Sequence, residues 1–124
     1  NVKDAQLVAG FSFQFVEMPH GPVTSTGFRF EADGKSLVYA TDFSEITPQM
    51  IKCFKGPDLL VVDCLRRRPH PTHAHRDMAI ELARKIKARK TVLTHMDKSM
   101  DYRTLCDEVP KDVVVGFDGL GLEV

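Results

Sequence analysis

The sequence predicts an α/β domain built on a mixed sheet with flanking helices. A hairpin-like pattern in the first third is followed by alternating strand-like and helix-like segments. The uninterrupted apolar run at 59–62 is typical of a strand that is covered on both faces in a parallel sheet. The 124 residues, of which 43% are hydrophobic and 27% charged, suffice for one domain but not for two.

The first third of the chain predicts three strands. Phe11, Phe13 and Phe15 alternate with polar residues, which indicates a strand with one buried face, and the Pro- and Gly-containing stretch 18–22 breaks it. Phe28 and Phe30 alternate in the same way, and a turn at 33–34 leads into the apolar stretch 37–40. We therefore expect a β-hairpin between about residues 28 and 40.

The remaining elements alternate between helix and strand. Thr47-Pro48 is typical of a helix start, and that helix should reach about Phe54. The strongest helical pattern places Met78, Leu82 and Ile86 on one face. Further elements are expected at 91–94 (strand), 102–108 (helix), 113–115 (strand) and after Asp118-Gly119 (a final strand). Right-handed crossovers would make the three central strands parallel, with their carboxyl ends at one edge of the sheet.

Composition disfavours several classes of partner. Lysine plus arginine equals aspartate plus glutamate at 17 each, so no overall field attracts nucleic acid or an anionic membrane. Cys53, Cys64 and Cys106 form no C-x-x-C pair, which argues against a disulfide framework and favours the reducing cytoplasm. No apolar run approaches the roughly 20 residues of a membrane span. A cytoplasmic protein that binds neither membrane nor nucleic acid is the expectation.

Four polar residues directly follow the predicted strands: His20, Asp42, Asp63 and His95. Imidazole and carboxylate groups bind zinc, manganese or iron, and two such ions roughly 3.5–4 Å apart can hydrolyse a phosphate ester. Histidine and aspartate are also ordinary at strand ends and caps. Asp63 is better suited to bonding backbone groups or orienting a histidine than to binding metal. The candidate metal ligands are therefore His20, Asp42 and His95.

The loop before the longest predicted helix concentrates three histidines, His70, His73 and His75. Backbone N–H groups at a helix start favour anions, so this loop is a candidate phosphate pocket in which a histidine binds substrate or protonates a leaving group. A solvated capping loop is the alternative. The run 66–68 of three arginines either adds charge to this pocket or, as is more common, forms a solvated edge or a partner surface.

Several short segments together resemble one family. They are Y-A-T-D at 39–42, D-C-L-R at 63–66, P-T-H at 71–73, L-T-H-M at 93–96 and F-D-G-L at 117–120. In this order and spacing they resemble the metallo-β-lactamase superfamily, in the branch of phosphoribosyl cyclic-phosphate phosphodiesterases.

The resemblance implies a role for individual residues. It implies that Asp42 bridges two metal ions, that His95 and His20 are metal ligands, and that His73 acts on the substrate phosphate or the leaving group. His75 is the competitor of His73 for that last role.

One departure from the family is large, because its H-x-H-x-D-H metal motif does not occur in this sequence. Members of the family are αββα sandwiches of two similar halves. The resemblance thus implies that residues 1–124 form one partial domain, the C-terminal half, with part of a two-ion manganese or zinc site. We expect this chain to be inactive by itself, and to self-associate through the uncovered face of its sheet.

The predicted function of the whole protein is that of a metal-dependent phosphodiesterase acting on a small cyclic or nucleotide-like phosphate ester. One alternative is an RNA-processing nuclease of the same superfamily, which the zero net charge disfavours. A second alternative is a non-catalytic α/β module for binding or dimerisation.

Overall fold

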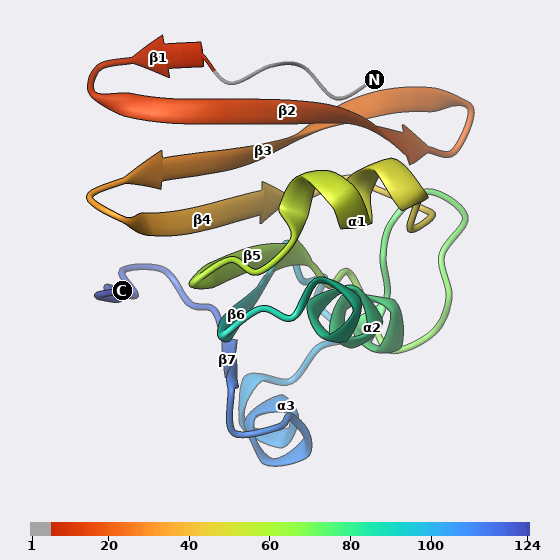
Figure 1. Cartoon of the computed structure of the whole chain (residues 1–124). Coiled ribbons are helices and arrows are strands. Elements are labelled where there is room, and N and C mark those ends of the chain that lie inside the picture. The colour runs from red at the N-terminus through yellow and green to blue at the C-terminus, as the bar shows by residue number, and fades with distance from the viewer. Residues whose placement is uncertain (1–5) are drawn as a thin grey trace.

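The seven strands of the sheet lie side by side in the order in which they occur along the chain (Figure 1). The structure, a computed structural model, describes residues 6–124, and within them three helices accompany the sheet. The strands are β1 (Gln6–Val8), β2 (Phe11–His20), β3 (Val23–Ala32), β4 (Lys35–Ala40), β5 (Leu59–Asp63), β6 (Lys90–Thr94) and β7 (Val113–Val115). The helices are α1 (Pro48–Phe54), α2 (Arg76–Ile86) and α3 (Tyr102–Glu108).

Strand direction divides the sheet into two parts. Strands β1 to β4 pair antiparallel through tight turns, whereas β4 to β7 pair parallel. The α/β fold with a mixed sheet and the parallel central strands, both predicted from the sequence, are confirmed. Strand β3 runs antiparallel to both of its neighbours, β2 and β4, so β2 runs in the same direction as β4, β5 and β6. The carboxyl ends of these four strands therefore share one edge of the sheet.

The helices begin where the sequence predicts. The Thr47 hydroxyl accepts the Met50 N–H at 3.2 Å, and Pro48 is the first residue of α1. The Asp101 carboxylate accepts the Thr104 N–H at 2.8 Å and starts α3 in the same way. Helix α2 ends at Ile86, and its C-cap residue, Lys87, has a left-handed backbone.

All three helices pack on one face of the sheet and form a single core with it. Figure 1 shows α1 near β2 and β3, α2 near β5 and α3 near β7. The core residues of the strands are alternate residues of one face, and those of α2 include Leu82 and Ile86, as the helical pattern predicts. This face of the sheet contributes Val16, Met18, Val38, Ala40, Leu60, Val62, Leu93, Val113 and Val115 to the core.

The opposite face carries a ladder of aromatic side chains that no described helix covers. Phe13 pairs with Phe30 and Phe15 with Phe28 across the two strands, with ring centroids 6.3 and 6.4 Å apart. The prediction that the face of Phe11, Phe13 and Phe15 is buried is wrong for this chain. Phe11 is exposed and the other two are half-buried, because the helices cover the opposite face, where Val16 and Met18 lie.

Two further expectations about strands need correction. No strand follows Asp118-Gly119: residues 116–124 have no strand, and the chain turns there with the Leu120 N–H bonded to the Phe117 carbonyl. The three-residue β7 is therefore the last strand among the described residues, and this segment does not pair with its free edge. The break also falls later than predicted, because β2 continues through Pro19 to His20 and only residues 21–22 form the turn.

The three cysteines have free thiols, and Cys53 and Cys64 are buried. Over the part of the chain that the structure describes, no helix combines the length and the apolar character needed to cross a membrane.

Candidate metal centre

The shared carboxyl edge of the sheet brings together residues from four strand ends. His20 is the last residue of β2, Asp63 is the last residue of β5, and His95 directly follows β6. Asp42 stands two residues after the end of β4. Residues that are up to 75 positions apart in the sequence thus meet because their strands run in the same direction.

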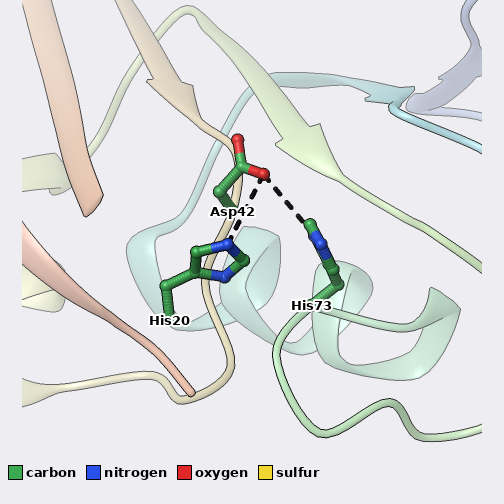
Figure 2. Close-up of side chains that lie close together, drawn as sticks. All are labelled: His20, Asp42 and His73. Carbon is green, nitrogen blue, oxygen red and sulfur yellow. Dashed lines mark ion pairs between the residues drawn. The ribbon is translucent and has the colours of Figure 1, made fainter. Parts of the chain in front are cut away.

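Asp42 is the hub of the cluster. Its Oδ1 lies 4.0 Å from His20 Nε2, 3.7 Å from His73 Nδ1 and 3.9 Å from His95 Nε2. Figure 2 shows the rings of His20 and His73 on either side of this one oxygen. The other oxygen, Oδ2, accepts the hydroxyl of Thr41 at 2.9 Å. One carboxylate oxygen is thereby held by the protein while the other faces three imidazoles.

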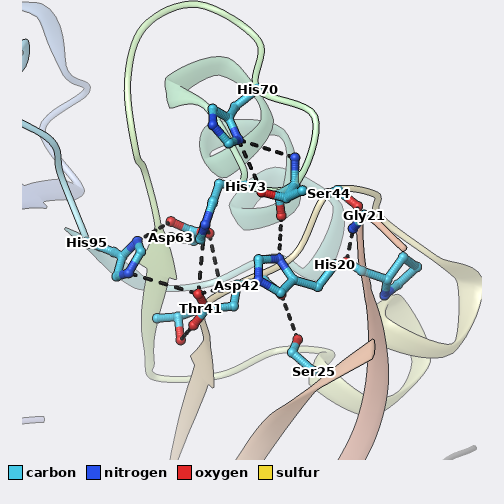
Figure 3. A network of polar contacts seen from close by, with 12 residues as sticks. His20, Gly21, Ser25, Thr41, Asp42, Ser44, Asp63, His70, His73 and His95 are labelled. Carbon is cyan, nitrogen blue, oxygen red and sulfur yellow. Dashed lines mark hydrogen bonds and ion pairs between the residues drawn. The ribbon is translucent and has the colours of Figure 1, made fainter. Parts of the chain in front are cut away.

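The backbone of Asp42 is fixed as firmly as its side chain. Its φ of 62° lies in the left-handed region, which aspartate tolerates better than most residues. Its N–H donates to Asp63 Oδ2 at 3.0 Å, and its carbonyl accepts the Ser25 hydroxyl at 2.6 Å (Figure 3). Contacts from two neighbouring segments therefore hold an unusual conformation that turns the carboxylate into the site.

The hydrogen bond of His20 defines which of its nitrogens is available. Its Nδ1 lies 2.6 Å from the Thr72 carbonyl, which can only accept, so Nδ1 carries the proton. Its Nε2 then presents a lone pair toward Asp42 Oδ1. A lone pair and a carboxylate oxygen 4.0 Å apart do not attract each other, but both attract a cation placed between them.

Asp63 supports the cluster from beneath. Its side chain is fully buried, and Oδ2 accepts both the Asp42 N–H and the Nδ1 of His73, the latter at 2.9 Å. These contacts agree with the expectation that Asp63 bonds backbone and orients a histidine. Its Oδ1 lies 3.3 Å from His95 Nδ1, but the pair lacks hydrogen-bond geometry and Oδ1 has no donor. A buried carboxylate oxygen without a donor, beside the imidazoles of His73 and His95, fits a site for a cation.

The residues present fit a divalent metal ion. One ligand atom from each of His20, Asp42 and His73 lies within 4.8 Å of the others, and the same holds for Asp63, His73 and His95. Cys64, which follows Asp63, adds no thiolate: burial, and then the negative charge of Asp63, raise the pKa of Cys64 to about 12. The donor set is therefore imidazole and carboxylate, as zinc and manganese sites use.

The three loop histidines have different positions. His73 lies in the cluster, with its ring 4.8 Å from that of His20 and 4.9 Å from that of His95. His70 lies outside it with its ring 5.3 Å from His73, and partial burial followed by the positive charge of Arg66 lower the pKa of His70. His75 is the N-cap residue of α2, and its Nδ1 is buried without a partner. Of the two candidates for the auxiliary role, the structure brings His73 to Asp42.

Residues 73–77 also read H-A-H-R-D, which matches the first five positions of the family's metal motif. The structure shows that this segment does not form such a site. His75 caps α2, and Asp77 is exposed on that helix, where it pairs with Arg76. The sequence places Met78 where the motif has its last histidine, and Met78 packs against the core.

The three consecutive arginines separate into different environments. Arg67 donates two hydrogen bonds to Glu108, both at 3.1 Å, and thereby joins the 66–75 loop to α3. Arg66 bonds the carbonyls of Arg68 and Pro69 within its own loop. Arg68 is exposed. The run is thus neither uniformly solvated nor uniformly part of a pocket.

Comparison with known proteins shows the family. Residues 2–96 match the model described as "Beta-lactamase superfamily domain". The chain belongs to the metallo-β-lactamase superfamily, whose members are metal-dependent hydrolases. This identification agrees with the resemblance seen in the sequence.

Solved structures share the fold over nearly the whole chain. A diphosphatase from the PhnP family is 34% identical with a TM-score of 0.88, and the similarity covers 98% of this chain and 46% of that one. Human tRNase Z, short form, is 20% identical (TM-score 0.77; 97% and 44% covered). Zinc-bound PqqB from Methylobacterium extorquens is 19% identical (TM-score 0.75; 98% and 53% covered). The last two similarities establish the fold alone.

A curated relative is longer still. An octanoyltransferase of Porphyromonas gingivalis is 26% identical over 115 residues, which are 91% of this chain and 23% of that protein. The chain therefore spans about half the length of the similar solved structures and less than a quarter of this relative.

Proposed function

We propose that this chain supplies one half of the active site of a metal-dependent phosphodiesterase that acts on a small cyclic or nucleotide-like phosphate ester. The observation that carries the proposal is the convergence of three imidazoles around Oδ1 of Asp42, with the buried Asp63 bonded to one of them. These imidazoles belong to His20, His73 and His95. The similarity to a diphosphatase supports a phosphate ester as the substrate class.

His20, Asp42 and His95 would hold the metal, which is manganese or zinc. A bound divalent ion in such a site polarises the phosphoryl group and lowers the pKa of a water molecule. Two ions need more ligands than these three residues provide. We propose that residues outside this chain supply the others, as in a sandwich of two halves, and that the chain is inactive without them.

His73 is suited to act on the substrate. Its Nδ1 faces the Asp63 carboxylate at 2.9 Å and therefore carries a proton, which leaves Nε2 free. When Nε2 is protonated, it can donate a hydrogen bond to a phosphate oxygen or a proton to the departing alkoxide. Asp63 would stabilise the resulting imidazolium. We assign this auxiliary role to His73 rather than to His75, which lies at the start of α2.

The test combines metal binding with hydrolysis. Zinc and manganese binding to the 124-residue chain would be measured by calorimetry, for the wild type and for His20→Ala, Asp42→Ala and His95→Ala. We expect each substitution to weaken binding by about tenfold or more. His75→Ala is the matched control, since this histidine belongs to the same loop and lies outside the cluster.

Hydrolysis of bis-p-nitrophenyl phosphate would be measured on this chain and on the longest natural form of the protein. We expect activity only where the complete ligand set is present. Absence of metal from every form, or metal binding that the three substitutions leave unchanged, would contradict the proposal. Rapid cleavage of precursor tRNA would instead favour the RNA-processing alternative.

A further inference from the structure

A hollow lies at the same edge of the sheet as the candidate metal centre. It has a volume of about 500 Å³ and is lined by Arg66, Arg67, Arg68, Asp97 and Ser99. Its two walls are the segments that continue from β5 and β6, joined by the hydrogen bond from the Asp97 N–H to the Leu65 carbonyl at 2.9 Å. The same two strands present Asp63 and His95 to the metal centre, so the hollow and the centre share one edge of the sheet.

The guanidinium groups around this hollow retain donors that the protein does not use. Arg67 is fully engaged, because its nitrogens donate to Glu108 and to the sulfur of Met100. Arg66 uses Nε and Nη2 on loop carbonyls, and its Nη1 has no partner among the described residues. Arg68 is exposed, and within residues 6–124 its side chain forms no hydrogen bond or ion pair.

The lining contains one acidic group, Asp97, which is bonded to a neighbouring residue of the same lining. The Asp97 Oδ1 accepts the N–H and the hydroxyl of Ser99 at 2.8 and 2.5 Å. These bonds, together with the charge of Arg66, lower the pKa of Asp97. The lowered pKa keeps this carboxylate negatively charged, so the lining has three guanidinium groups and one carboxylate. Arg67 is paired with Glu108, so Arg66 and Arg68 supply the positive charge that favours an anion.

We propose that this arginine hollow binds a second anionic group, a phosphate or a carboxylate, of the substrate whose scissile phosphoryl group lies at the metal centre. The inference rests on the proposed function and narrows it to esters with a further negative charge, such as a nucleoside diphosphate derivative. Arg68 and Nη1 of Arg66 supply the charge-assisted hydrogen bonds. The volume of the hollow is typical of a small-molecule site rather than of a strand of nucleic acid.

The test uses inorganic pyrophosphate as the probe, with a chelator present so that no metal-bound anion contributes. Binding to the 124-residue chain is measured by calorimetry at low and at high salt. We expect saturable binding that weakens with salt, and a loss of about tenfold in Arg68→Ala, because one charge-assisted contact disappears. Arg68→Lys retains the charge and should recover part of the affinity.

Arg103→Ala is the matched control. Arg103 is an exposed arginine on α3 with no partner among the described residues, and it does not line the hollow. Its substitution should leave pyrophosphate binding unchanged. Arg68 and Arg103 are exposed, and among the described residues neither side chain forms a hydrogen bond or an ion pair, so both variants should fold as the wild type does.

The outcomes separate this inference from the proposed function. If pyrophosphate binds only in the presence of metal and Arg68→Ala leaves its affinity unchanged, the anion site in the hollow is disproved while the proposed metal centre is not. An oligoribonucleotide that binds far more tightly than pyrophosphate through Arg68 would also overturn it, in favour of a nucleic-acid surface. If pyrophosphate binds without metal and Arg68→Ala weakens this binding, the anion site in the hollow is supported even if the hydrolysis test fails.

Discussion

Asp63 at the end of β5 is hydrogen-bonded to His73 of the histidine loop, with 2.9 Å between Asp63 Oδ2 and His73 Nδ1. The same carboxylate oxygen accepts the Asp42 N–H at 3.0 Å. One buried atom therefore orients both the hub of the candidate metal centre and the histidine proposed to act on substrate. A change at Asp63 should affect both without removing any proposed ligand.

The first prediction concerns Asp63→Asn, which preserves the shape and removes the charge. We expect zinc affinity to fall by about 10- to 100-fold, because the backbone N–H of the proposed ligand Asp42 loses its charged acceptor and the ligand is held less firmly. The free energy of unfolding should fall by about 1–3 kcal/mol, since charge-assisted hydrogen bonds become neutral. A competitive zinc titration and urea unfolding would measure the two effects. Asp107→Asn, at an exposed position of α3, should change neither, and equal behaviour of the two variants would disprove the role of Asp63.

The second prediction concerns the packing of α1 on the sheet. A Cβ atom at Gly27 would lie 2.6 Å from the ring of Phe54 and 2.7 Å from the sulfur of Met18. Gly27→Ala should therefore cost about 1–3 kcal/mol of unfolding free energy by overpacking. Urea unfolding would detect it. Gly121→Ala is the control, because a Cβ there meets no atom within 4 Å, and a similar loss in both variants would contradict the packing argument.

The third prediction concerns the uncovered aromatic face. Phe28 and Phe30 stack with ring centroids 5.8 Å apart. An apolar hollow of about 330 Å³ is lined by these two rings together with Ala9, Phe11 and Phe13. We expect the 124-residue chain to self-associate at micromolar concentration, because pairing two such faces removes apolar surface from water. Sizing with light scattering would measure it.

Phe13→Ser together with Phe28→Ser should shift the chain toward the monomer. Tyr102→Ser, which removes an exposed aromatic ring on the helix-covered side, should not. A monomeric wild type would show that the aromatic face does not drive association.

The fourth prediction concerns pH. Hydrogen bonds from Arg67, and the nearby charge of that group, lower the pKa of Glu108, with Arg76 adding to the effect. A carboxylate with a lowered pKa in the folded state stabilises the fold above its unfolded pKa of about 4.3, and the stabilisation is lost as pH falls through the folded value. Glu108→Gln should therefore be less stable than the wild type at about pH 6, and the difference should shrink at about pH 3.

Urea unfolding at both pH values tests this, with the exposed Glu45→Gln as the control. A difference between wild type and Glu108→Gln that stays constant with pH would exclude the ion pair as its cause.

Much of the fold is visible in the sequence because local signals are strong. Thr47-Pro48 starts α1, the turn at 33–34 separates β3 from β4, and the apolar run 59–62 lies in β5. The strand expected after Asp118-Gly119 is absent, because the chain turns at 117–120 and does not pair with the edge strand β7, which a local pattern does not reveal. Strand β1 carries no pattern of its own and exists through its pairing with β2.

The candidate site was less accessible to sequence reasoning. The strand-end rule finds His20, Asp42 and His95 because parallel strands place their carboxyl ends together. The choice between His73 and His75 depends on how the 66–75 loop folds back, which the hydrogen bond between His20 and the Thr72 carbonyl defines. The alternation of Phe11, Phe13 and Phe15 correctly marks an apolar face, but periodicity cannot tell which face the helices cover.

The order of the strands has a consequence for how the chain folds during synthesis. Each strand of the sheet pairs with the one made just before it, so the sheet can grow strand by strand as the chain leaves the ribosome. His95 follows β6, and it is the last of the proposed ligands to be synthesised. The nascent chain therefore cannot bring His20, Asp42 and His95 together around a metal until the strands β1 to β6 have emerged.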